Sequence, residues 1–166
     1  VVGSLSTDAA LGLGLQVLAR WLHALGYALG FGVLAFNRLV LRPPAGEYTR
    51  VYERRLHRLI TLGLVLLVLA EPLALVGQTA SLGTGTLFDG GVAGAALATG
   101  FGRVLAQRMG AAVLLWVLLG AIGEGSGTAA RIALAVGLAL ALIDGAASHA
   151  IATTPVWLGV IGKALH

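Results

Sequence analysis

The sequence predicts an all-α protein, a polytopic bundle of transmembrane helices in a single domain. Its 166 residues are 58% hydrophobic and only 11% charged, whereas soluble domains carry about 25% charged residues. Several apolar runs reach the roughly 20 residues that a helix needs to cross the hydrocarbon core, and glycine-rich or charged segments separate them. Too few polar side chains are present to cover a water-soluble globule, so the predicted solvent is a lipid bilayer.

The first predicted helix covers residues 13–41 and ends before Pro43 and Pro44, which a helix interior does not tolerate. A polar, basic stretch follows, and the second predicted helix covers residues 59–82. Loops rich in Lys and Arg stay on the cytoplasmic side of a membrane. The basic stretch, residues 38–58, is therefore predicted to be cytoplasmic and the N-terminus to lie outside. Its charged residues are Arg38, Arg42, Arg50, Arg54, Arg55 and Arg58, against Glu47 and Glu53.

Residues 83–103 are too rich in glycine and threonine for a clean span, and we expect an outer loop with a short surface helix there. The third helix is predicted over residues 104–122. The flexible turn GEGSGT then leads to a fourth helix over residues 130–151. After Pro155, residues 156–166 cover only about half of a crossing. Four full helices and the start of a fifth are therefore expected.

Composition excludes several kinds of site. The chain has no cysteine, which excludes disulfides, thiolate metal sites and cysteine catalysis. Met109 is the only methionine, so a methionine-rich metal relay is excluded as well. The net charge of +4 comes largely from the basic stretch, which membrane orientation explains better than binding to nucleic acid. No pairing of a nucleophile with a base is visible, so an enzyme is not expected.

Ionisable residues inside the predicted spans are the candidate functional residues, because burying such groups in lipid is costly, roughly 2.5–3.5 kcal/mol for Asp, Lys or Arg. They are Arg20, His23, Glu71, Arg108, Asp144, His149 and His166. Given the predicted topology, His23 lies about 15 Å below the outer start of its helix, at 1.5 Å per residue. His149 and His166 fall in the same outer half of the membrane. Imidazole binds copper, zinc and iron, so this trio predicts a bound metal ion or, alternatively, an axially held haem.

Structural roles are the alternatives for the same residues. Each histidine could instead hydrogen-bond a neighbouring helix. Glu71 precedes Pro72 and could relay protons or cations, or could stay protonated by burial. Asp144 could pair with Arg108 or Arg20, or compensate the charge of a bound ion. Arg20 is expected to snorkel to the interface, and Gly26 and Gly30 are expected to serve close packing within the bundle.

Three segments resemble the copper resistance D (CopD) family of bacterial membrane proteins. They are ARWLHALGYALGFGVLAF in the first helix, LATGFGRVLAQR over residues 97–108, and the C-terminal SHAIATTPVWLGVIGKALH. The resemblance implies a polytopic protein of copper uptake or tolerance that works with a periplasmic copper-binding partner. It also implies that His23, His149 and His166 are copper ligands. The first helix alone is also similar to haem-binding four-helix families, among them a bacterial protoporphyrinogen oxidase.

The leading hypothesis is therefore a copper-handling protein of the bacterial inner membrane, with copper ion as its ligand and membrane lipids around it. Copper would enter at His149 and pass to His166 and His23, while Glu71 or Asp144 compensates its charge. The alternative is a subunit of a larger membrane complex, either binding haem b or purely structural, that associates with other membrane subunits through its helices.

Overall fold

The computed structural model describes residues 7–40, 48–82 and 89–146, and within them all regular structure is helical. The prediction of an all-α fold is confirmed. The elements are α1 (Thr7–Tyr27), the π-helical turns η1 (Ala28–Gly32) and η2 (Phe36–Val40) on either side of α2 (Val33–Ala35), α3 (Tyr48–Ser81), α4 (Gly90–Leu97), α5 (Gly100–Gly123) and α6 (Gly127–Ala146).

Four of the described helices are long and apolar enough to cross a membrane: Thr7–Val40, Tyr52–Ser81, Gly100–Gly123 and Gly127–Gly145. The first helix begins at Thr7 rather than near residue 13. The second begins at Tyr48 rather than near residue 59, because arginine and glutamate are good helix formers and the basic stretch extends the helix. The short helix expected within residues 83–103 is α4. The start of a fifth helix, predicted over residues 156–166, lies outside the described residues.

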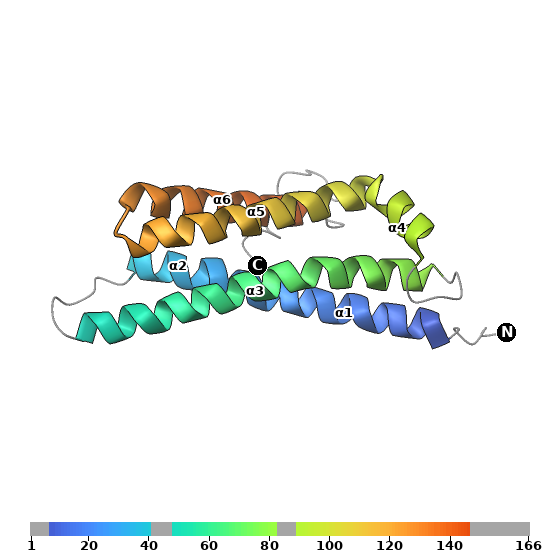
Figure 1. Cartoon of the computed structure of the whole chain (residues 1–166), viewed down its shortest axis with the longest axis horizontal. Coiled ribbons are helices and arrows are strands. Elements are labelled where there is room, and N and C mark those ends of the chain that lie inside the picture. Colours follow the sequence, from blue (N-terminus) through green and yellow to red (C-terminus); the bar gives the residue numbers. More distant parts are fainter. Residues whose placement is uncertain (1–6, 41–47, 83–88, 147–166) are drawn as a thin grey trace, which may run out of the picture.

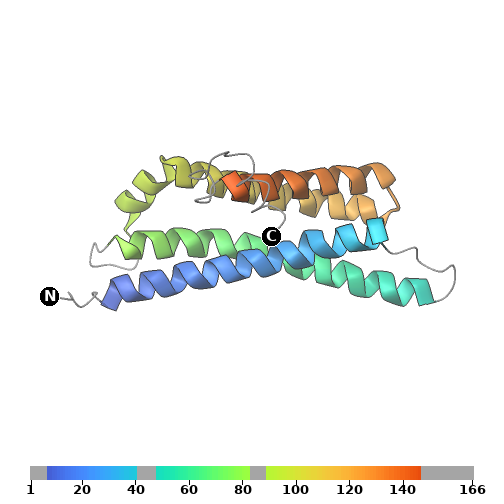
Figure 2. The same cartoon turned by 180° about the vertical axis from the view of Figure 1, so that it is seen from behind.

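The helices form two layers that run up and down along one axis. Figures 1 and 2 show the continuous α1–η2 helix crossing α3 in one layer, with α5 and α6 side by side in the other. Successive long helices are antiparallel, and the described part of α6 ends near the middle of the bundle's length. Large apolar side chains point outward from them, including Trp21, Leu39 and Val117, as expected for surfaces that face lipid.

Glycines bring α1 and α3 into backbone contact where they cross. A Cβ added to Gly26 would lie 2.8 Å from the carbonyl oxygen of Gly63. A Cβ added to Gly63 would collide with the backbone of Gly26 and Gly30. Small residues allow this close approach, and in lipid the resulting dispersion contacts hold helices together. The predicted role of Gly26 and Gly30 in packing within the bundle is thus confirmed.

An apolar core fills the space between the two layers. Leu64 on α3 and Leu140 on α6 are fully or almost fully buried, and Leu115 on α5 is 4% exposed. Phe31 of η1 reaches across the layers and packs directly on Gly137 of α6. The core lies in the half of the bundle that is toward the basic stretch.

The corner between α4 and α5 explains part of the segment LATGFGRVLAQR. The hydroxyl of Thr99 accepts a hydrogen bond of 3.2 Å from the backbone N–H of Phe101 and so caps the start of α5. A Cβ on Gly102 would collide with the backbone of Leu97. Thr99 and Gly102 therefore set a tight turn, which gives this part of the motif a structural role.

We expect Thr99→Val to lower the free energy of unfolding by about 1 kcal/mol, because valine keeps the shape and removes the capping oxygen. Thr128→Val is the matched control, since Thr128 is exposed in the first turn of α6. Denaturant titration in detergent micelles, followed by circular dichroism, measures both. Equal stability of the two variants would contradict the capping role.

Candidate functional site

Four ionisable side chains, one from each long helix, meet between the two layers. The imidazole of His23 on α1 lies between two carboxylates: Nδ1 is 2.9 Å from Oε1 of Glu71 on α3, and Nε2 is 2.9 Å from Oδ2 of Asp144 on α6. The guanidinium of Arg108 on α5 donates from Nε to Oδ1 of Asp144 at 2.7 Å. We call these four residues the polar cluster.

Glu71 is the most buried member of the polar cluster, with a side chain only 2% exposed. Its Oε1 meets His23, but its Oε2 is buried without a hydrogen-bond partner. Nη1 of Arg108 lies 3.9 Å from Oε2, within ion-pair range but too far for a hydrogen bond. A buried carboxylate oxygen in this state leaves an open position for a donor or a cation.

The polar cluster sits on the same helix faces as the core. On each helix one apolar or aromatic residue lies a single turn from the cluster member, on the side toward the basic stretch: Tyr27, Leu67, Ala112 and Leu140. The hydroxyl of Tyr27 donates to the carbonyl oxygen of Gly137 at 3.0 Å and joins α1 to α6 beside the cluster. The cluster therefore lies at the end of the apolar core that is farther from the basic stretch.

The hydrogen-bond partners of His23 determine how many protons the polar cluster holds. A neutral imidazole has one donor and one acceptor nitrogen, and an ionised carboxylate only accepts. Both nitrogens of His23 face carboxylate oxygens at 2.9 Å. Either His23 is an imidazolium, or one carboxyl carries a proton and donates it. In both arrangements the summed charge of the four side chains is zero, as a site surrounded by lipid requires.

Further polar groups continue from the polar cluster toward the end of the bundle where α1 begins. Gln16, two turns before His23, donates from Nε2 to the carbonyl oxygen of Gly77 at 3.2 Å and to Oγ of Ser81 at 2.9 Å. Gln16 and Tyr27 were not among the predicted residues. The signal that could have found them is their helical spacing from His23, which places all three on one face of α1.

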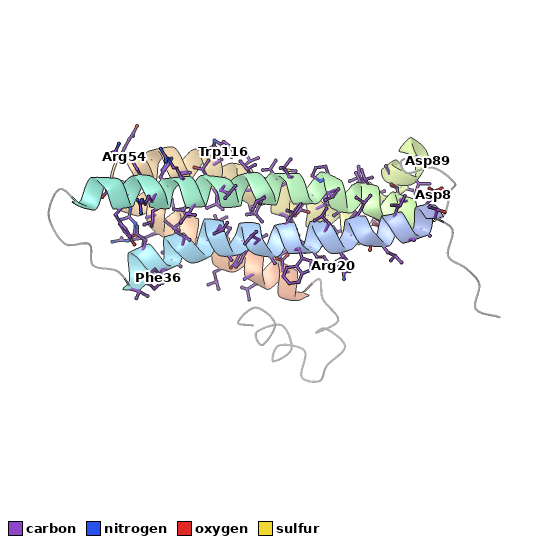
Figure 3. All side chains as sticks on the ribbon, turned by 90° about the horizontal axis from the view of Figure 1, so that it is seen from below. Asp8, Arg20, Phe36, Arg54, Asp89 and Trp116 are labelled. Carbon is purple, nitrogen blue, oxygen red and sulfur yellow. The ribbon has the colours of Figure 1, made fainter. Side chains whose placement is uncertain are left out.

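The predicted pairing of Asp144 with Arg108 is confirmed, while Arg20 is exposed near the middle of α1 (Figure 3). His149 and His166 lie outside the described residues, so their convergence with His23 stays a prediction. Within the described ranges, no group of three or more His, Asp or Glu side chains is arranged to hold a metal ion.

Residues 8–160 match the family described as copper resistance protein D-like, N-terminal domain. The chain belongs to this family. Together with the four apolar helices found among the described residues, this makes it a copper-related, multi-pass membrane protein. No curated protein and no solved structure showed a significant match.

Proposed function

We propose that this chain binds copper and passes it across the bacterial plasma membrane, acting as a carrier rather than an enzyme. The polar cluster is the observation that carries the proposal. It places one imidazole and two carboxylates in the interior of a membrane bundle, and histidine nitrogen with carboxylate oxygen is a donor set that suits Cu(II). Membership of the copper resistance family supports copper as the cargo.

In the arrangement described, both nitrogens of His23 are engaged by carboxylates. Copper therefore gains a nitrogen of His23 only when one of these hydrogen bonds opens and its proton leaves. The unpartnered Oε2 of Glu71 supplies a second donor atom in the same place. We propose that His149 and His166 complete the ligand set, as the family resemblance implies.

Arg108 has a distinct part in the proposed cycle. Its guanidinium is held by Asp144 at 2.7 Å and neutralises carboxylate charge while no copper is bound. A second cation arriving beside this guanidinium is repelled by it, which weakens copper binding and favours release. Conduction through a membrane needs such moderate affinity, since an ion that binds too tightly does not leave.

The distribution of polar groups supports an entrance from the end where α1 begins. On that side the polar cluster is followed by the polar contacts of Gln16, whereas the apolar core around Leu64 and Leu140 closes the opposite side. The arginines of the basic stretch favour a cytoplasmic location for the closed end. We therefore propose that copper enters from the outside, delivered by a periplasmic copper-binding partner.

Metal analysis and an absorption spectrum of the purified protein in detergent test this proposal. We expect about one copper per chain after loading and dialysis, and loss of that copper in His23→Ala, because the replacement removes the one described imidazole in the polar cluster. His57→Ala is the matched control, since His57 is exposed on α3 near the basic end of the bundle.

Copper retained equally by His23→Ala and His57→Ala would contradict a role for the polar cluster in binding. A Soret band in the purified protein would favour the haem alternative and electron transfer instead. Size-exclusion chromatography of each variant shows that any copper loss is not a loss of folding.

A further inference from the structure

A second candidate site lies at the opposite end of the bundle from the start of α1. There the structure has a cavity of about 1130 Å³ between η2, the first turns of α3 and the turn that joins α5 to α6. Typical small-molecule sites measure roughly 300–1,000 Å³, so this cavity is large enough for an extended ligand. None of its lining residues belongs to the polar cluster.

The cavity lies where the membrane-spanning helices end. The first span ends at Val40, the second begins at Tyr52, and the third ends at Gly123. Figure 3 shows Phe36 and Arg54 at this end and Asp8 and Asp89 at the other. The cavity is therefore at the level of the lipid headgroups, with the hydrocarbon region beginning directly beside it.

The lining of the cavity is basic at its mouth and apolar at its base. Arg38 and Arg54 line it together with His57, and among the described lining residues only Glu53 carries a carboxylate. The apolar part includes Leu34, Leu119 and Ile122, which belong to or pack against the hydrophobic core. Two guanidinium groups are suited to a phosphate, and the apolar wall is suited to an acyl chain.

We propose that this cavity binds an anionic phospholipid of the surrounding leaflet, with its phosphate held by Arg38 and Arg54. Basic pockets between transmembrane helices are known to take anionic lipid headgroups. Free phosphate would share the contacts to the arginines but would leave the apolar wall facing water. The wall of Leu34, Leu119 and Ile122 is thus the feature that selects a lipid over a soluble phosphate.

Native mass spectrometry of the full chain in detergent, titrated with phosphatidylglycerol, tests the site. We expect one tightly bound lipid per chain, and an affinity about thirtyfold lower in Arg38→Gln/Arg54→Gln, because each guanidinium loses its charge-assisted hydrogen bonds to the phosphate. Arg55→Gln/Arg58→Gln is the matched control. It removes the same charge from exposed positions at the start of α3 that do not line the cavity. At physiological ionic strength salt screens the attraction between charges that are not in contact, so we expect a change of no more than about threefold.

An equal loss of lipid affinity in the two double variants would mean that the lipid is attracted only by the surface charge. That result would contradict binding in the cavity. If the first double variant does not fold, Arg38→Gln is compared with Arg58→Gln in the same way. Excess inorganic phosphate is expected to leave the lipid bound. Displacement by phosphate would assign the cavity to a soluble phosphate and overturn the lipid proposal.

Discussion

Replacing Arg108 by methionine is expected to destabilise the bundle by about 3 kcal/mol, since removing one partner of an ion pair inside a membrane bundle leaves an uncompensated charge. Arg108 is the cation that the structure places against both Asp144 and Glu71. Without it the polar cluster loses its zero net charge in a surrounding that cannot solvate the excess. Denaturant titration in detergent, followed by circular dichroism, measures the change.

Arg103→Met is the matched control for this prediction, because Arg103 is exposed on the same helix. We expect little change there. A double-mutant cycle with Asp144→Asn isolates the pair itself: Arg108→Met should cost less when Asp144 has already lost its charge, with a coupling of about 0.5–3 kcal/mol. Additive effects of the two changes would show that Arg108 does not stabilise the bundle through Asp144.

Gly63→Ala is expected to lower the free energy of unfolding by more than about 2 kcal/mol, although alanine is the better helix former. The added methyl group would collide with the backbone of α1 at Gly26 and of η1 at Leu29 and Gly30. Backbone atoms cannot rotate away as a side chain does, so the two helices must separate along their crossing. The loss of close contact between α1 and α3 should also weaken the contact of His23 with Glu71.

Gly14→Ala provides the control, because a Cβ at Gly14 meets nothing within 4 Å. There we expect a gain of up to about 1 kcal/mol from helix propensity alone. If Gly63→Ala lowers and Gly14→Ala raises the free energy of unfolding, the contact between helices determines the effect at Gly63, and helix propensity does not. A stabilising Gly63→Ala would contradict the close approach of the two helices.

Much of the fold could be predicted from the sequence because the bilayer limits what a chain can do. Apolar runs of sufficient length must be helices, since no water is present to satisfy the backbone. The helix boundaries were predicted less well. α3 continues through Arg54, Arg55 and Arg58, where charge indicated a loop but helix propensity favours a helix.

The sequence by itself determined that the chain is an all-α membrane protein, that it resembles the copper resistance family, and that His23, Glu71, Arg108 and Asp144 are costly enough to need partners. Only the tertiary structure decided which partners they take. The sequence grouped His23 with two other histidines, whereas the structure places its imidazole between Glu71 and Asp144. Residues far apart in the chain meet only when each helix is rotated so that the right face points inward. Two contacts fix these rotations: the glycine crossing of α1 with α3, and the packing of Phe31 on Gly137. Helical periodicity determines which residues share one face of a helix, but packing between helices determines which residues that face contacts.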